Sequence, residues 1–150
     1  MIVYMLKAHH EHFYDGNVEV DDFLIGFFDS IEKCETIEQE YKKKAGFSLP
    51  NVFFSYTPWP CSGEEMDSPG FVYYVAHSFM DAGGWEDNDD IGVFASMKEA
   101  EVAKNDYIST GKANRRRLNG NAEEPYLLNQ TEIIKYEINK KYWTDGFITD

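Results

Sequence analysis

The feature that most constrains the fold of this chain is an internal repeat. Residues 25–41 align without a gap on residues 91–107 at a constant offset of 66 positions, and six of the 17 aligned pairs are identical. The match is densest where Ile25-Gly26-Phe27-Phe28-Asp29-Ser30 meets Ile91-Gly92-Val93-Phe94-Ala95-Ser96. Self-similarity at one period is typical of a duplicated structural unit. The repeat therefore predicts two related units in a chain of 150 residues.

Each copy predicts the same order of elements. An apolar run at 2–7, or at 71–77 in the second copy, predicts a strand covered on both faces and central in its sheet. An acidic loop then leads into a short second strand, and the expected ranges are 11–22 and 23–28 in the first copy and 81–90 and 91–94 in the second. A hairpin is the simplest connection between the two strands.

A helix and a third strand complete each copy. Ser30 and Ser96 are typical N-caps, because a serine hydroxyl accepts a backbone N–H of the first helical turn. An apolar stripe at helical spacing predicts burial of Ile31, Cys34, Ile37 and Tyr41 in one helix and of Met97, Ala100, Ala103 and Tyr107 in the other. Third strands are expected at 51–57 and 131–139, the latter with Ile134, Tyr136 and Ile138 on one face.

The fold class expected from this order is α+β, with two tandem ββαβ units packed as one pseudo-symmetric body. A stretch rich in proline, glycine and acidic residues separates the copies. We expect a first unit at 1–60, a linker at 61–70 and a second unit at 71–150. Units of this size bury only a modest fraction of their surface, which favours a shared core or a continued sheet.

The formal net charge of −13 restricts the partners of the chain. A surface of this sign repels phosphate backbones, so direct binding of nucleic acid through a broad basic face is excluded, whereas basic partners are favoured. The apolar N-terminal run is too short for a secretory signal, and no run is long enough to cross a bilayer. Two cysteines are too few for a disulfide framework. We expect a cytoplasmic protein with Cys34 and Cys61 reduced.

The two acidic loops are the candidate partner-binding site, because each combines carboxylates with aromatic side chains. Charge accelerates the encounter with a basic partner, and an aromatic ring supplies desolvated contact area. The candidate residues are Tyr14, Asp15, Glu19, Asp21 and Asp22 in the first loop and Trp85, Glu86, Asp87, Asp89 and Asp90 in the second.

The second copy also carries a recognisable pattern. It consists of Val72-Tyr73, His77, the acidic loop, Ile91–Ser96 with Glu99-Ala100-Glu101, Tyr136-Glu137-Ile138 and Trp143-Thr144-Asp145-Gly146-Phe147. This pattern resembles short bacterial proteins and domains of unknown function. The resemblance implies a small bacterial α/β module and no particular activity. The first copy departs from the pattern, since Pro58-Trp59-Pro60 stands there without a following Gly-Phe.

Motifs for metals, nucleotides and catalysis are weak or missing. His9, His10 and His12 with Asp15 have ligand chemistry, but in a strand His9 points away from the other two. The run Asp87-Asn88-Asp89-Asp90 fails as a calcium loop, because Ile91 stands where an oxygen ligand is needed. No P-loop, dinucleotide fingerprint or nucleophile elbow is present. We therefore expect no metal, no cofactor and no catalytic residue.

The leading expectation is a non-enzymatic binding protein that occludes a basic partner protein, in the manner of an immunity protein or antitoxin that neutralises a nuclease-like toxin. Such an inhibitor must be acidic, because a nuclease is basic where it grips phosphates. Two alternatives remain open: an enzyme or small-ligand binder that uses the cleft between the two units, with His9 and His77 in it, and a structural module without a single partner. The oligomeric state is left open.

Overall fold

The computed structural model describes residues 1–44, 51–61, 68–80, 86–110 and 129–143. Within these residues the chain forms two three-stranded sheets and two helices, which confirms the α+β class. The chain divides into two compact units, one made of Met1–Pro60 with Glu137–Asp150 and one made of Cys61–Tyr136. The C-terminal segment, which we expected in the second unit (71–150), thus groups with the first. Cys61, expected in a linker (61–70), groups with the second.

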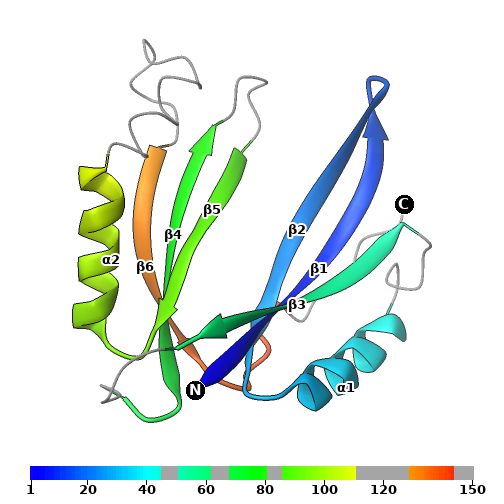
Figure 1. The fold of residues 1–150 in the computed structure, drawn as a ribbon. Helices are drawn as coiled ribbons and strands as arrows, with labels where there is room; N and C mark the ends of the chain where they lie inside the picture. Colours follow the sequence, from blue (N-terminus) through cyan, green and yellow to red (C-terminus); the bar gives the residue numbers. More distant parts are fainter. Residues whose placement is uncertain (45–50, 62–67, 81–85, 111–128, 144–150) are drawn as a thin grey trace. The chain divides into compact units, whose positions relative to one another are not determined.

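The sheet of the first unit is built around strand β1 (Ile2–Tyr14). β1 pairs antiparallel with β2 (Asn17–Phe28) on one side and with β3 (Val52–Pro60) on the other. Helix α1 (Ile31–Lys42) follows β2 and packs on this sheet (Figure 1). The central position predicted for the first strand is therefore confirmed.

Alternate residues of β1 build the core beneath α1. Leu6 and Ala8 are fully buried against Cys34 and Tyr41 of the helix. Tyr56 of β3 packs at the margin of this core, where its hydroxyl donates a hydrogen bond of 2.8 Å to Glu38. Burial, together with this carboxylate, raises the pKa of Tyr56. The hydroxyl therefore stays protonated and keeps the helix tied to the edge of the sheet.

The segment that follows the last strand joins the first unit along part of β2. The N–H groups of Asn139 and Tyr142 each donate a 2.7 Å hydrogen bond to a β2 carbonyl, of Phe27 and Ile25 respectively. Trp143 then stacks on Phe23 with ring centroids 4.4 Å apart. A side chain at position 26 would clash with the carbonyl of Lys140, so glycine there permits the close approach.

Asn139 is the corner of this segment. Its φ of +67° lies in the left-handed region, and its side chain bonds both the N–H and the carboxylate of Asp29, each at 3.1 Å. Hydrogen bonds from Lys33 and then Asn139 lower the pKa of Asp29. Asn139 thus hydrogen-bonds the residue that follows β2, and its left-handed backbone turns the C-terminal segment.

The second unit has the same strand order. β4 (Phe71–Met80) lies between β5 (Glu86–Phe94) and β6 (Asn129–Glu137), and α2 (Met97–Ser109) follows β5. Tyr73, Val75 and Ala100 form its core, with Ile133 of β6 packed against them. On the face predicted to be apolar in the last strand, Ile134 is exposed, whereas Tyr136 and Ile138 are half-buried. Adjacent isoleucines lie on opposite faces of a strand, and Ile133, which packs on the core beneath α2, is half-buried,.

Local details recur at the repeat offset of 66. Each first hairpin contains a β-bulge that leaves one isoleucine unpaired, Ile25 before Gly26 in one unit and Ile91 before Gly92 in the other. Each helix begins at a serine whose hydroxyl accepts a backbone N–H three residues later, at 3.2 Å. The predicted N-caps Ser30 and Ser96 are confirmed.

The predicted helix stripes are confirmed in part. Cys34, Tyr41, Ala100 and Tyr107 are buried, and Ile37 and Ala103 are half-buried. Ile31 and Met97, which we expected in the core, are exposed. Both are the first residue of their helix, directly after the N-cap serine.

The acidic stretch of the first unit is a hairpin and not a loop, contrary to the prediction for residues 11–22. β1 and β2 run to a two-residue turn at Asp15-Gly16, with φ values of +52° and +78°. Positive φ at both positions is what a type I′ turn requires, and Asp-Gly is a typical sequence for it. In the second unit, residues 86–90 likewise belong to strand β5.

Replacement of Asn139 tests its role at the corner. Asn139→Ala loses both hydrogen bonds to Asp29 and strains the left-handed backbone, and we expect a cost of about 2–3 kcal/mol in the free energy of unfolding. Asn139→Gly loses the same hydrogen bonds without the strain, so it should be milder by about 1 kcal/mol. Urea unfolding monitored by circular dichroism measures both. Equal stability of the two variants would contradict the strained corner.

The same variant has a predictable pH dependence. A lowered pKa means that the contribution of Asp29 is present near neutral pH and is lost as the pH falls through its folded-state pKa,. The gap in stability between the native chain and Asn139→Ala should therefore narrow in acid. Urea midpoints measured at neutral pH and in acid provide the comparison.

The buried thiol of Cys34 gives a second test of the core. Burial raises its pKa to about 11, so little thiolate is present at pH 8, and the side chain is fully buried. We expect Cys34 to react with a disulfide reagent only when urea unfolds the chain. Comparison with Cys34→Ser assigns the signal. Rapid labelling of Cys34 without denaturant would show that the core is open.

Candidate protein-binding arm

The end of the β1–β2 hairpin, residues 9–22, extends past the rest of its sheet, and we call it the arm. The last β1–β3 pair is His10 with Val52, whereas β1 and β2 stay paired out to Tyr14 and Asn17 (Figure 1). Beyond His10 the structure is a two-stranded ribbon. Such ribbons are marginally stable alone, so this one depends on continuity with the sheet.

One face of the arm, called here the apolar face, carries three exposed apolar side chains beside Glu11. Phe13 lies opposite Val18, and Glu11 lies opposite Val20, so strand alternation places all four side chains on this face,. Phe13 is 83% exposed, Val18 58% and Val20 45%. Isolated exposed apolar residues are ordinary, but neighbours on one protruding face are typical of an interaction site.

The opposite face of the arm is ionic. His10 lies opposite Asp21 and His12 opposite Glu19. His12 Nε2 lies 2.9 Å from Asp21 Oδ2, on the diagonal of this ladder, and the two imidazole rings are 5.7 Å apart. The arm therefore presents two chemically different surfaces, one on each side of the same pair of strands.

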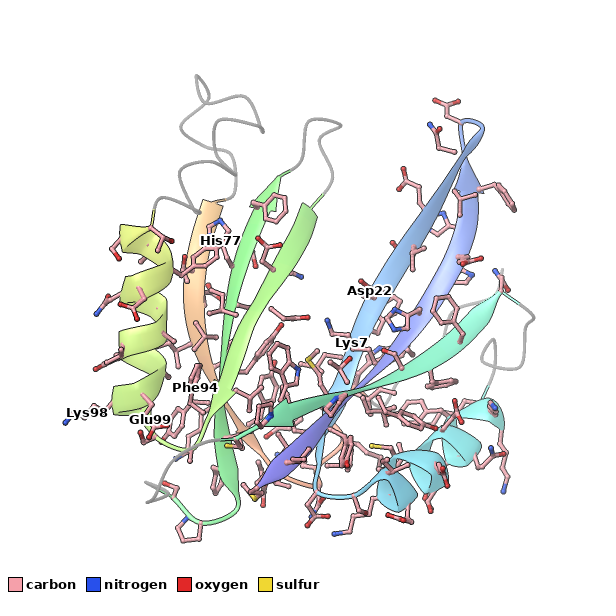
Figure 2. The ribbon with its side chains drawn as sticks, viewed as in Figure 1. Lys7, Asp22, His77, Phe94, Lys98 and Glu99 are labelled. Atoms are coloured by element: carbon pink, nitrogen blue, oxygen red, sulfur yellow. The ribbon has the colours of Figure 1, made fainter. Side chains whose placement is uncertain are left out.

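His9 anchors the base of the arm to the sheet. Its Nδ1 lies 2.5 Å from Asp22 Oδ1, its Nε2 lies 2.7 Å from Ser55 Oγ, and its ring stacks on Phe53 at 4.7 Å. These contacts join all three strands of the first sheet. Among the predicted site residues, Asp22 thus has a structural contact as well as an exposed carboxylate (Figure 2).

The charge of the arm has one sign. It carries five carboxylates and no lysine or arginine, since the sequence has neither between Lys7 and Lys33. The five are Glu11, Asp15, Glu19, Asp21 and Asp22. Asp15 and Asp21 are exposed and Glu19 is half-buried. The structure thus brings four of the five predicted residues of the first unit onto one element, and the side chain of the fifth, Tyr14, lies outside the described part.

The predicted residues of the second unit have a different environment. Asp89 accepts a hydrogen bond of 2.9 Å from Tyr107, and Asp90 accepts one from Tyr74. Burial, together with Asp90, raises the pKa of Tyr74, so this donor keeps its proton. Trp85 and the side chains of Glu86 and Asp87 lie outside the described residues. Asp89 and Asp90 thus have bonding partners within their own unit.

The histidines do not form a metal centre in the part of the chain that the structure describes. No group of three histidine, cysteine or carboxylate side chains lies close enough there to hold an ion. His9 and His77, each on the central strand of its unit, differ by one residue in register. Counted from the bulges, His77 (Figure 2) matches the buried Ala8 of the first unit. Its Nδ1 lies 2.9 Å from Thr131 Oγ1 on the α2 side of its sheet.

Comparison of the chain with protein-family models, with curated proteins and with solved structures finds no match. In the described residues, neither helix has the length and the apolar character needed to cross a membrane. The arm, rather than any relative, therefore carries the functional argument.

The apolar face of the arm was missed in the sequence. Phe13, Val18 and Val20 alternate with polar residues around Asp15-Gly16, which is a strong hairpin signal,. Because the acidic residues predicted a loop, their alternation with apolar residues was not interpreted as two faces.

The two classes of carboxylate should respond differently to mutation. Asp89→Ala removes the acceptor of the 2.9 Å hydrogen bond from Tyr107, and we expect a loss of about 1–3 kcal/mol in the free energy of unfolding,. Asp21→Ala, at an exposed site, should change stability by less than about 0.5 kcal/mol. Chemical unfolding measures the stability of both variants. Equal losses would show that Asp89 is no more important for folding than Asp21.

Proposed function

We propose that this chain is a non-enzymatic acidic binding protein that occludes a basic partner protein, in the manner of an immunity protein, an antitoxin or another small inhibitor. The observation that carries the proposal is the arm. It is a protruding element with five carboxylates, no lysine or arginine and an exposed phenylalanine close to its tip. A toxin with a cationic, nuclease-like groove is a partner of matching charge.

In the proposed complex, charge and apolar area affect different rates of binding. Carboxylates of one sign on an extended element attract a basic groove and disfavour acidic surfaces, mainly through the rate of association. An aromatic side chain that becomes desolvated slows dissociation. Phe13 on the arm supplies such a side chain beside the charges.

The alternative of a small-ligand site between the two units has less support. His9 bonds to Asp22 and Ser55 of the first unit, and His77 bonds to Thr131 of the second. Both rings are thus engaged within their own sheets. We propose further that the protein acts in the cytoplasm, where the buried Cys34 and Cys61 stay reduced,.

We also propose that the two units arose by tandem duplication of one ββαβ unit and pack as a pseudo-symmetric pair. Supporting observations are the shared strand order, the bulged isoleucines Ile25 and Ile91, and the N-cap serines, all at equivalent positions.

Capture at low salt tests the binding role. The immobilised chain is exposed to a lysate of the native organism, and bound proteins are eluted with rising salt. We expect basic proteins to be retained and to elute as salt screens the charges. Glu19→Lys with Asp21→Lys should lower retention by about tenfold or more, because each reversal replaces an attraction by a repulsion.

The matched control reverses two carboxylates elsewhere. Glu35→Lys with Glu101→Lys changes the net charge by the same amount, from −13 to −9, at exposed and equivalent positions of the two helices. Retention of the control variant should stay close to that of the native chain. Equal losses in both variants would mean that net charge alone causes binding, and the arm proposal would fail.

A further inference from the structure

Strand β2 has an outer edge that is only partly covered. At Ile25 and Phe27 the C-terminal segment bonds to this edge. Along residues 17–22 no other strand of the described chain lies beside it, and β2 is the terminal strand of its sheet. A stretch of extended backbone of this kind is a template for another strand.

The hairpin turn determines which backbone groups point outward. In a two-residue hairpin the pair that flanks the turn, Tyr14 with Asn17, exchanges hydrogen bonds. The pairs after it alternate, so that the next pair, Phe13 with Val18, does not exchange them,. Val18, Val20 and Asp22 therefore direct their N–H and C=O groups away from β1. The assignment is checked on the other strand: Glu11, opposite Val20, donates its N–H outward to Asn51 at 2.9 Å.

The side chains beside this edge alternate in chemistry. Val18 and Val20 lie on the apolar face of the arm, and Glu19 and Asp21 lie on its ionic face. Side chains of an added strand would continue both faces. One set of alternate residues would then contact valines, and the other would contact carboxylates.

We propose that the outer edge of β2 at residues 17–22, which no described strand covers, binds an extended segment of the basic partner as a fourth strand, and that this segment alternates apolar and basic residues. The inference rests on the proposed function and specifies its mode of contact. Backbone hydrogen bonds to Val18, Val20 and Asp22 supply the binding, and the alternate side chains supply the selectivity.

Charge selects this occupant over a second copy of the chain. Pairing of two β2 edges would bring Glu19 and Asp21 of one copy beside the same carboxylates of the other. Like charges opposite each other on neighbouring strands are destabilising. A lysine or arginine in the added strand would instead meet these carboxylates with opposite charge.

Short capped peptides test the proposal on the full chain. One peptide alternates lysine with valine, a second alternates lysine with serine, and a third alternates glutamate with valine. We expect the lysine–valine peptide to bind about tenfold tighter than either control, measured by calorimetry at low salt. Comparable binding of the lysine–serine peptide would mean that charge alone acts, and that result would overturn the proposal.

Amide hydrogen exchange tests whether the peptide binds as an added strand. Saturation with the lysine–valine peptide should slow exchange of the outward amides of Val18, Val20 and Asp22 by about tenfold. The inward amide of Glu19, already paired with β1, should change little and is the internal control. Outward amides that are already protected in the free chain, or that stay unprotected in the complex, would refute strand addition.

Two variants distinguish the contribution of backbone hydrogen bonds from that of the carboxylates. Val20→Pro removes one outward donor without touching the β1 pairing and should weaken the peptide about tenfold, provided that the Glu19 amide remains protected. Glu19→Gln with Asp21→Asn keeps the edge intact and should abolish the preference for lysine–valine over glutamate–valine. A preference that survives this change would contradict the proposed selectivity.

The two proposals fail in different ways. If a captured basic partner depends on Glu19 and Asp21 but leaves the outward amides of β2 unprotected, the binding role stands and strand addition is wrong. If the arm variants retain basic proteins as well as the native chain does, while the peptide still protects these amides, the β2 edge can bind a strand but the proposed function is wrong. Sedimentation of the free chain as a dimer through β2 would point to a second copy as occupant and reject the basic segment.

Discussion

The arrangement of the first unit depends on the central strand β1, which changes its environment along its length. Its first half supplies Leu6 and Ala8 to the core beneath α1, and its pairing with both β2 and β3 holds the sheet together. Past His10 it loses β3 but keeps β2. A strand that is immobilised at one end carries its other end outward at little cost in further ordering. The arm is in this sense a consequence of the core, with His9 fastening its base through Asp22, Ser55 and Phe53.

A second constraint is the use of the β2 edge by the end of the chain. Asn139 and Tyr142 take the β2 carbonyls at Phe27 and Ile25, and Trp143 covers Phe23. This contact requires a glycine at position 26 and a left-handed residue at Asn139. The covered part of β2 is the part next to the core. The part of β2 that no described segment covers coincides with the arm, and this is the part to which we assign the proposed strand addition.

Much of the fold followed from local sequence rules, and the failures have physical causes. The serine caps, the central apolar strands and the buried Cys34 and Tyr41 depend on short-range preferences and on one period, and they were predicted correctly. The arm was misread because five carboxylates favour a loop by composition, although Asp15-Gly16 fixes a hairpin by geometry. The segment from Asn139 to Trp143 could not be assigned to the first unit, because its partners lie more than a hundred residues away in sequence. The roles of Asp89 and Asp90 depend on tyrosine hydroxyls that no local pattern specifies.

The free edge of β2 also explains why the arm is acidic. An exposed edge with Val18 and Val20 is a hazard, because another copy of the same chain is always the nearest source of a matching strand,. Carboxylates at alternate positions counter this hazard, since they repel the identical edge of a second molecule. The same carboxylates attract a strand of opposite charge. If the partner is basic, as we propose, protection against self-association and selection of that partner place the same requirement on Glu19 and Asp21, and a single alternating pattern meets both.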